Sequence, residues 1–329
     1  MILAGDIGGT NTRLASYDVK NKRLTPRVEE TFPSRDYAGL AEIVRRFVSA
    51  HGLHVTHACF GAAGPVLNGV VKTTNLPWVI DAQQLAQQLA IRSVGLINDL
   101  ESNAYGIAEL RPEDFAILNE GRSDAQGNAA IIAAGTGLGE AGLYWDGIRH
   151  CPFATEGGHA DFGPNNELQL ELLRYLFKEF GHVSWEWVLS GLGLRNLYKF
   201  LRDTGRGEEP PWLAQELRER DPGAVITQAA LGKRSDLCVQ ALHLFVSLYG
   251  AEGGNLALKI KATGGLYVGG GIAPKILSTL QDGTFMEAFL AKGRMRPLLE
   301  TMPVRVILND KTALLGAGRY AFLKSLSGA

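Results

Sequence analysis

The feature that most constrains the fold is a strand–turn–strand pattern that occurs twice. An apolar strand, a turn of glycine and threonine, and a second apolar strand follow one another in residues 2–17, and the same order recurs in residues 129–145. The turns are Gly8-Gly9-Thr10 and Gly135-Thr136-Gly137-Leu138-Gly139. Glycine lacks a Cβ atom, so the backbone can reverse tightly at both places. We therefore expect two β-hairpins, each belonging to its own α/β domain.

A second repeat supports this division. A short apolar strand, an Asn-Asp pair and a helix occur at Val94 to Leu100, and the same order recurs at Val304 to Leu323. The two repeats indicate internal duplication, which implies two α/β domains with a cleft between them; the alternative is coincidence between short patterns. Residues 167–262 carry helical rather than strand signals. The predicted division is a small domain of residues 1–110 plus 304–329 and a large domain of residues 111–303 with helical insertions.

The composition narrows the class of protein. Hydrophobic residues make up 46% of the 329 residues, enough for large cores, and the formal net charge is −1. This charge argues against nucleic acid or an anionic membrane surface as a partner, and no apolar run is long enough to span a bilayer. The cysteines, Cys59, Cys151 and Cys238, lack zinc or redox spacing, which fits a reducing cytoplasm.

The first glycine turn has the residues of a phosphate-binding loop. Backbone N–H groups in such a turn can point at a phosphate, and Thr10 and Asn11 add side-chain donors. Asp6, at the strand end, is placed to hold Mg²⁺ directly or through its water. The second turn is neither a P-loop nor a dinucleotide fingerprint, because no Gly-Lys-Ser/Thr and no helix follows. Two plain hairpins are the structural alternative; otherwise the pair grips one polyphosphate.

Asn98-Asp99 ends one apolar strand and opens a helix. Asp99 is therefore either a helix N-cap or a group that orients a hydroxyl. A helix N-terminus favours the ionised carboxylate and makes it a weaker base. That weakness matters little in phosphoryl transfer, whose transition state is loose and rewards alignment more than basicity.

Two further motifs offer ligand contacts. Glu156-Gly157-Gly158-His159, followed by Asp161, can converge on a polyol, because carboxylates accept from hydroxyls and histidine donates or accepts. A metal site is disfavoured by the lack of a cysteine or second histidine, and a core histidine beside a surface glutamate is the plain alternative. Gly269-Gly270-Gly271 follows a strand and offers bare backbone to an adenine or ribose; the plain alternative is a helix start or a strand end with no ligand.

These motifs, in this order, resemble the bacterial glucokinases of the sugar kinase, actin and heat-shock chaperone superfamily. The resemblance extends to His182-Val183-Ser184-Trp185-Glu186 and Val188-Leu189-Ser190-Gly191, and runs nearly from end to end. The segment directly after His159, Ala160-Asp161-Phe162-Gly163-Pro164, contains no cysteine, and no helix-turn-helix precedes Asp6, so the resemblance is to the zinc-free, non-repressor branch. It implies two ribonuclease H-like α/β domains with an interdomain cleft, which is the hexokinase/actin-like ATPase fold.

The resemblance also implies the activity, the ligands and the site. The expected reaction transfers the γ-phosphoryl group of ATP to the 6-hydroxyl of glucose, with Mg²⁺ near Asp6 and the chain as a cytoplasmic homodimer. Asp99 would be the catalytic base. The expected sugar ligands are Asn98, Asp99, Glu156, His159 and Glu186. The expected ATP contacts are Gly5, Asp6, Ile7, Gly8, Gly9, Thr10, Asn11, Gly135, Thr136, Gly137 and Gly270.

Some alternatives stay open on the sequence alone. The sugar-binding role of Glu186 is implied by the resemblance alone, and the alternative is a solvated surface carboxylate. Leu100-Glu101 and Leu192 depart from the family pattern, and neither is expected to touch a ligand-binding side chain. The other functions considered are a broader hexokinase, a non-catalytic sugar sensor and a chaperone-like or filament ATPase.

Overall fold

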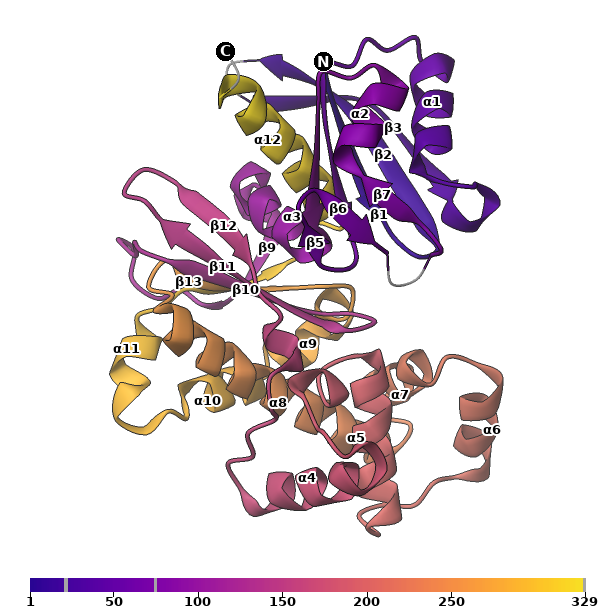
Figure 1. Cartoon of the computed structure of the whole chain (residues 1–329). Helices are drawn as coiled ribbons and strands as arrows, with labels where there is room; N and C mark the ends of the chain where they lie inside the picture. The colour runs from indigo at the N-terminus through magenta and orange to yellow at the C-terminus, as the bar shows by residue number, and fades with distance from the viewer. Residues whose placement is uncertain (21–22, 74–75, 328–329) are drawn as a thin grey trace. The chain divides into compact units, whose positions relative to one another are not determined.

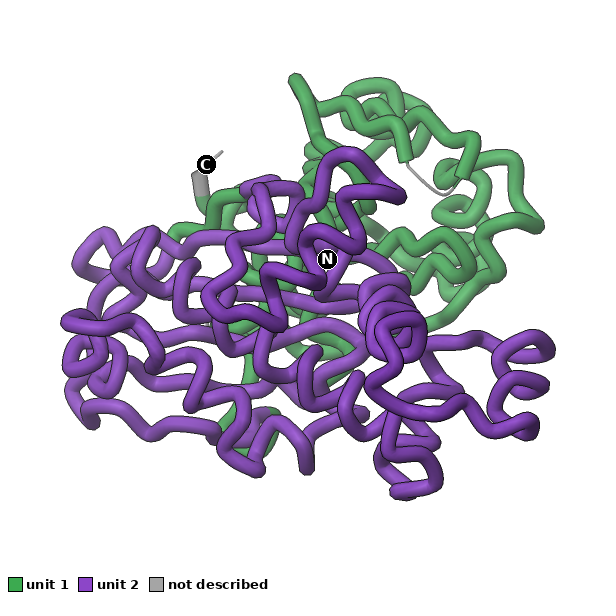
Figure 2. Tube along the Cα trace, turned by 90° about the horizontal axis from the view of Figure 1, so that it is seen from below, with its two compact units in different colours: residues 1–114, 151–154, 309–329 green, residues 115–150, 155–308 purple. Residues whose placement is uncertain are grey.

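The computed structural model describes residues 1–20, 23–73 and 76–327. The chain divides into two compact units, which Figure 2 colours separately. Unit 1 comprises residues 1–114, 151–154 and 309–329, and unit 2 comprises residues 115–150 and 155–308. Residues 304–308 thus group with unit 2, whereas the sequence prediction placed them in the small domain; residues 111–114 and 151–154 group with unit 1, whereas it placed them in the large domain.

Unit 1 is built on a mixed sheet in the order β3-β2-β1-β4-β8. Its first three strands in sequence form antiparallel pairs, and β1, β4 and β8 run parallel. The strands are β1 (Ile2–Ile7), β2 (Asn11–Lys20), β3 (Arg23–Pro33), β4 (His57–Ala62) and β8 (Ser93–Asn98). A small antiparallel sheet contains β5 (Val66–Leu67), β6 (Val70–Lys72) and β7 (Val79–Asp81).

Both faces of the unit 1 sheet are buried. Along β1, Leu3 and Ile7 belong to one apolar cluster and Ile2 and Ala4 to another, because successive strand side chains point to opposite faces. The first cluster packs under α1 and α2; the second packs under α12, which lies beside β1 (Figure 1). The helices and short 3₁₀ turns of this unit are η1 (Ser34–Asp36), α1 (Leu40–Ala50), α2 (Ala82–Leu89), α3 (Asp99–Gly106), η2 (Ile107–Glu109), η3 (Pro112–Asp114) and α12 (Thr312–Ser327).

The six-stranded sheet, which lies mostly in unit 2, has the order β12-β11-β10-β13-β14-β9, and residues 151–154 of its edge strand β12 are grouped with unit 1. The hairpin β10–β11 is antiparallel, whereas β10, β13 and β14 run parallel. The run from β12 to β14 therefore reproduces the order of the unit 1 sheet, which supports the predicted duplication. The strands are β9 (Phe115–Asn119), β10 (Ala129–Ala134), β11 (Leu138–Trp145), β12 (His150–Ala154), β13 (Gly265–Gly269) and β14 (Val304–Ile307).

Helices dominate the rest of unit 2. The long helix α8 packs against α10 so closely that a Cβ atom on Gly254 would meet the backbone oxygen of Phe289. The helices and 3₁₀ turns are η4 (Gly157–His159), α4 (Glu167–Phe180), η5 (Trp185–Trp187), α5 (Gly191–Asp203), α6 (Pro211–Glu219), α7 (Pro222–Leu231), α8 (Asp236–Ile260), η6 (Ala273–Ile276), α9 (Leu277–Leu280), α10 (Thr284–Leu290), η7 (Gly293–Met295) and α11 (Arg296–Glu300). None of the helices in the described part of the chain is long and apolar enough to cross a membrane.

Most of the predicted elements are confirmed. The predicted hairpins are β1–β2 and β10–β11, and Asp81 caps α2 by accepting from the backbone N–H groups of Gln83 and Gln84. Of the plain alternatives for Gly269-Gly270-Gly271, the strand end is found, since β13 ends at Gly269, and the helix start is not, since η6 begins only at Ala273. The strands β9 and β12 and the small sheet were not predicted.

Candidate active site

The predicted phosphate loop of unit 1 is a tight turn between β1 and β2. The Gly8 N–H donates to the Asn11 carbonyl at 2.9 Å, and the Ser34 hydroxyl donates to the Gly8 carbonyl at 2.8 Å. Ser34 is buried and also lies 2.9 Å from the Thr12 hydroxyl. Thr10 and Asn11 are exposed. The turn is thus held from inside the unit while its outer residues stay accessible to a ligand.

The structure brings Asp6 and Asp99 together within unit 1. The pKa of Asp6 is raised to about 6, chiefly by burial and also by the negative charge of Asp99, while Arg13 opposes the shift. Two carboxyl groups from two adjoining elements, the end of β1 and the start of α3, therefore share one electrostatic environment.

The helix cap at this place is Asn98 rather than Asp99. The Asn98 side-chain oxygen accepts from the backbone N–H groups of Leu100 at 2.8 Å and Glu101 at 3.3 Å. Its amide also donates to the Gly64 carbonyl at 3.3 Å. Asp99 is the first residue of α3, and its carboxylate accepts from the Leu100 N–H at 2.9 Å. Asn98 supplies the cap, so the N-cap alternative for Asp99 falls away.

Close backbone packing holds α3 in place. A Cβ atom on Gly106 would collide with the Thr312 carbonyl, and one on Gly316 would collide with the Ser102 carbonyl. The Ser102 hydroxyl donates to the Ala313 carbonyl at 2.7 Å. Helices α3 and α12 therefore touch backbone to backbone, and α12 anchors the helix that begins with Asp99.

The glycine turn of unit 2 is tied to two neighbouring segments. The Gly135 N–H donates to the Gly137 carbonyl at 2.8 Å, and the Gly135 carbonyl accepts from the Gly191 N–H at 2.9 Å. The Leu138 N–H donates to the Glu186 carboxylate at 2.9 Å. A Cβ atom on Gly137 would collide with that carboxylate, so the glycine lets Glu186 approach. Glu186 is thus bonded to this turn and is not a freely solvated group.

Three of the predicted sugar ligands meet in unit 2. His159 Nδ1 lies 4.0 Å from a Glu186 carboxylate oxygen, and its Nε2 lies 4.0 Å from a Glu156 carboxylate oxygen. The imidazole side chain is 61% exposed, which excludes the reading of His159 as a core residue. Asp161 instead pairs with His182 at 2.8 Å. An open imidazole between two carboxylates offers both donors and acceptors to a polyol.

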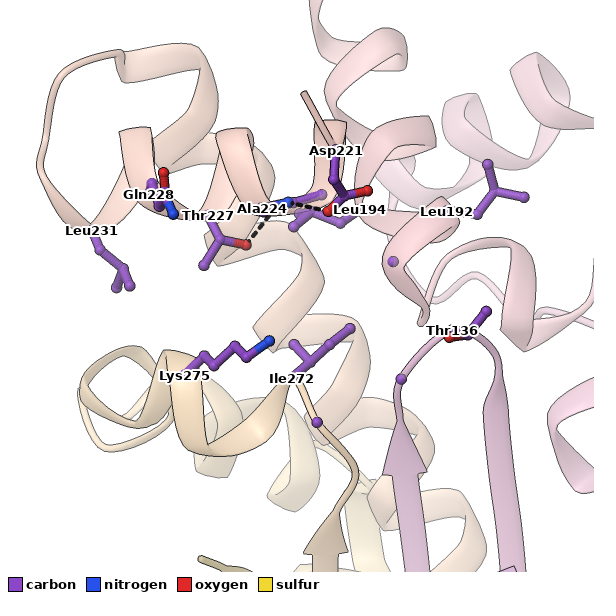
Figure 3. Close-up of a pocket in the computed structure, with 14 residues that line it drawn as sticks. Thr136, Leu192, Leu194, Asp221, Ala224, Thr227, Gln228, Leu231, Ile272 and Lys275 are labelled. Atoms are coloured by element: carbon purple, nitrogen blue, oxygen red, sulfur yellow. Dashed lines mark hydrogen bonds between the residues drawn. The ribbon is translucent and has the colours of Figure 1, made fainter. Parts of the chain in front are cut away.

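A cavity of about 710 Å³ adjoins the same glycine turn. This volume is typical of small-molecule sites. In Figure 3, Thr136 lies on one side of the cavity, residues of α7 on another, and Lys275 extends its ammonium toward the space. The lining residues are Gly135, Thr136, Gly191, Leu192, Leu194, Asp221, Gly223, Ala224, Thr227, Gln228, Leu231, Gly271, Ile272 and Lys275.

The cavity changes two of the sequence expectations. Gly271 lines it, whereas Gly270 does not; Gly270 has φ 83°, and a Cβ atom there would collide with the Ala134 backbone. Leu192 also lines the cavity, so the expectation that this departure from the family pattern touches no ligand site does not hold if the cavity binds nucleotide. The α7 segment carried no motif in the sequence. The one available signal was Asp221-Pro222, a helix start, with Asp221 capping Ala224 at 2.8 Å.

Asp6 and Asp99 also bear on the choice of metal. Among the described residues, no group of three or more His, Cys, Asp and Glu side chains is arranged to hold a metal ion. Mg²⁺ usually takes one or two carboxylates and completes its shell with water and substrate phosphates. Asp6 and Asp99 supply two carboxylates of one unit, and this donor set fits Mg²⁺ bound together with a nucleotide.

Comparisons with known proteins agree on the class. The crystal structure of a glucokinase from an Antarctic psychrotroph matches with a TM-score of 0.84 at 32% identity, over 97% of this chain and 98% of that one. A ROK family glucokinase from Streptomyces griseus, solved in complex with glucose and AMPPNP, matches with a TM-score of 0.66 at 22% identity, over 97% and 98% of the two chains. The second likeness concerns the fold alone. The fold is that of the hexokinase-like two-domain sugar kinases.

Sequence similarity identifies the family. A family model described as Glucokinase matches residues 3–324. The chain is 44% identical over 337 residues to a curated glucokinase of Nostoc sp., with 98% of each chain covered. The chain belongs to the glucokinase family, and the resemblance seen in its motifs is confirmed.

Proposed function

We propose that the protein is an ATP-dependent glucokinase that transfers the γ-phosphoryl group to the 6-hydroxyl of glucose. The observation that carries this proposal is the double role of Glu186. Its carboxylate accepts from the Leu138 N–H of the glycine turn and lies beside His159 of the Glu156–His159 motif. One side chain thus joins a phosphate-type turn to a polyol-type cluster, as a sugar kinase requires.

The cavity of unit 2 is the proposed nucleotide site. Leu194, Leu231 and Ile272 offer apolar surface for a base, and Lys275 offers positive charge to phosphates. Gly135 and Thr136 also line the cavity, and they are part of the turn that the sequence assigns to phosphate. The relative that was solved with AMPPNP supports an adenine nucleotide as donor.

Asp99 is the proposed group that aligns the 6-hydroxyl. Its place at the start of α3 favours the ionised carboxylate, which would accept a hydrogen bond from the hydroxyl and orient its oxygen for attack. Phosphoryl transfer has a loose transition state, so this alignment contributes more than early proton removal. Asp6 would hold Mg²⁺, which when bound would neutralise charge on the transferred phosphate. Asn98, whose side-chain oxygen caps α3 and whose NH₂ group donates to the Gly64 carbonyl, would reach the sugar from the same turn.

Replacing Asp99 by Asn tests the assignment. We expect kcat to fall roughly 10²–10⁴-fold, in the range of general acid–base groups, while glucose binding persists. Asp81→Asn is the matched control, because it is an aspartate-to-asparagine change in unit 1 that preserves a helix cap. Near-normal turnover in the Asp99 variant would remove Asp99 from the reaction. Two results would refute the proposed function: ATP hydrolysis at the same rate with and without sugar, or no ADP formation with any hexose.

A homodimer and a cytoplasmic location complete the proposal. Both come from resemblance to the bacterial glucokinases. The dimer is tested by the mass of the purified protein in light scattering, where a monomer at micromolar concentration would contradict it.

A further inference from the structure

A pair of carboxyl groups lies buried behind the sugar-binding turn. Glu140, on β11, is 2% exposed, and Glu252, on α8, is fully buried. Glutamate is almost never buried without a compensating partner. Neither side chain has a part in the proposed reaction, so the pair needs a separate explanation.

The partners of the pair are unequally divided. Glu252 accepts from the Asn255 amide at 2.7 Å and from the Lys259 ammonium at 3.3 Å. Lys292 supports this side by donating to the Asn255 side-chain oxygen at 2.7 Å and to the Ala251 carbonyl at 2.8 Å. Oε1 of Glu140, in contrast, faces no hydrogen-bond donor in the described part of the chain. Two carboxylates can only accept, whereas a proton on Glu140 makes it a donor to Glu252.

Glu140 also lies directly against the sugar-binding turn. A Cβ atom on Gly157 would collide with Oε2 of Glu140. The Thr155 hydroxyl donates to the Glu140 main-chain carbonyl at 2.7 Å and accepts from the Gly157 N–H at 3.2 Å. Gly158 packs in the same way on the Leu138 carbonyl. The turn that presents Glu156 and His159 therefore rests on β11, with the Glu140 carboxyl as part of the supporting surface.

We propose that Glu140 is a positioning residue of the sugar site, and that it acts as a neutral acid whose proton is donated to the Glu252 carboxylate. With the proton in place, the two carboxyl groups attract and Gly157 rests on a fixed surface. Without it, two buried negative charges repel, and the Glu140 side chain must move toward Gly157 or toward solvent. This inference rests on the proposed role of Glu156 and His159 in sugar binding.

The proton is lost in an accessible pH range. The pKa of Glu140 is raised to about 8, chiefly by burial and also by the charge of Glu252 and a hydrogen bond with it, while Lys259 opposes the shift. The other titratable groups that act on the pair are Tyr249 and Lys292. Burial also holds the pKa of Tyr249 far above this range, so the phenol stays neutral. The competent, protonated form therefore prevails below pH 8 and declines above it.

The experiment is the pH dependence of the KM for glucose between pH 7 and pH 9.5. If only the protonated form binds sugar well, the competent fraction at pH 9 is about one tenth, so KM rises about tenfold from its value at pH 7. Glu140→Gln keeps the shape, and its amide still donates to Glu252, so its KM should stay constant over this range. The KM for ATP should stay flat in both proteins.

Control variants distinguish failure of the proposed Glu140 role from failure of the proposed sugar site. Glu209→Gln, another glutamate of unit 2 that bonds Tyr198 and Arg202, should retain the tenfold rise. A flat glucose KM in the unmodified protein, or the same rise in Glu140→Gln, overturns the positioning role. If Glu140→Gln does not fold, the profile of the unmodified protein decides alone. A Glu156→Gln variant with an unchanged glucose KM would instead refute the sugar site itself.

Discussion

Replacing Tyr249 by Phe tests whether one hydroxyl joins the two glycine turns of unit 2. Tyr249 is fully buried; its hydroxyl accepts from the Ala134 N–H at 3.0 Å and donates to the Gly269 carbonyl at 3.1 Å. These two residues end β10 and β13, immediately before the turns at Gly135 and Gly270. Phe fills the same space, so no cavity forms, but a buried N–H and a buried C=O lose their partner. We expect a loss of roughly 2–4 kcal/mol, at about 1–3 kcal/mol for each unsatisfied group.

Urea denaturation measures this loss as a lower midpoint at an unchanged slope. Tyr175→Phe is the matched control, because it removes the same hydroxyl from an exposed hydrogen bond to Asp203 and should cost less than about 1 kcal/mol. The KM for ATP should also rise in Tyr249→Phe and not in Tyr175→Phe, since the strand ends support the proposed nucleotide turns. Equal losses of stability in the two variants would refute the reasoning.

Three further predictions concern unit 1. Asp81→Ala removes the cap of α2 and should lower the free energy of unfolding by about 1 kcal/mol, measured by urea denaturation. Gly316→Ala places a methyl group against the Ser102 carbonyl, so α12 must move, and the free energy of unfolding should fall by more than about 3 kcal/mol in the same assay. Gly318→Ala is the control: its methyl group would meet side chains and no backbone, so the fall should be smaller. Asp6 has a pKa of about 6 and is therefore mostly neutral below that pH. If its ionised form is needed to bind Mg²⁺, kcat/KM for MgATP should fall as the pH drops from 7 to 5. A constant kcat/KM over this range would show that the reaction does not need the ionised form.

The strands and helices could be predicted because their signals are local. The apolar run of β1 predicts a strand, and the spacing of apolar residues in α1 predicts a helix, each from a few neighbouring residues. Strand β9 could not be found, since its residues are only partly buried and it joins the sheet through β14, almost 200 residues away in the chain. Pairing over such a distance leaves no pattern in the strand itself.

The candidate site likewise contains residues that local motifs predict and residues that only the packing reveals. Motifs that combine glycine with a polar side chain, such as Glu156–His159, stand out because glycine is costly unless backbone must approach something. Asn98 and Asp99 were both selected, but which of them caps α3 depends on backbone angles that the sequence does not state. The α7 wall of the cavity and the Glu140–Glu252 pair went unseen, because ordinary helix and strand residues become special only through what packs against them.

The packing of α12 on the sheet of unit 1 has a consequence for synthesis on the ribosome. Strands β1, β2, β4 and β8 emerge early, yet the face that carries Ile2, Ala4 and Cys59 is covered partly by α12, the last helix of the described chain. About 200 residues separate α3 from α12. At ordinary elongation rates, α12 is therefore synthesised on the order of 10–40 s after α3, and this apolar face stays uncovered by α12 during that time. The nascent chain is therefore most exposed to aggregation, and most in need of chaperones, before its C-terminal helix leaves the ribosome.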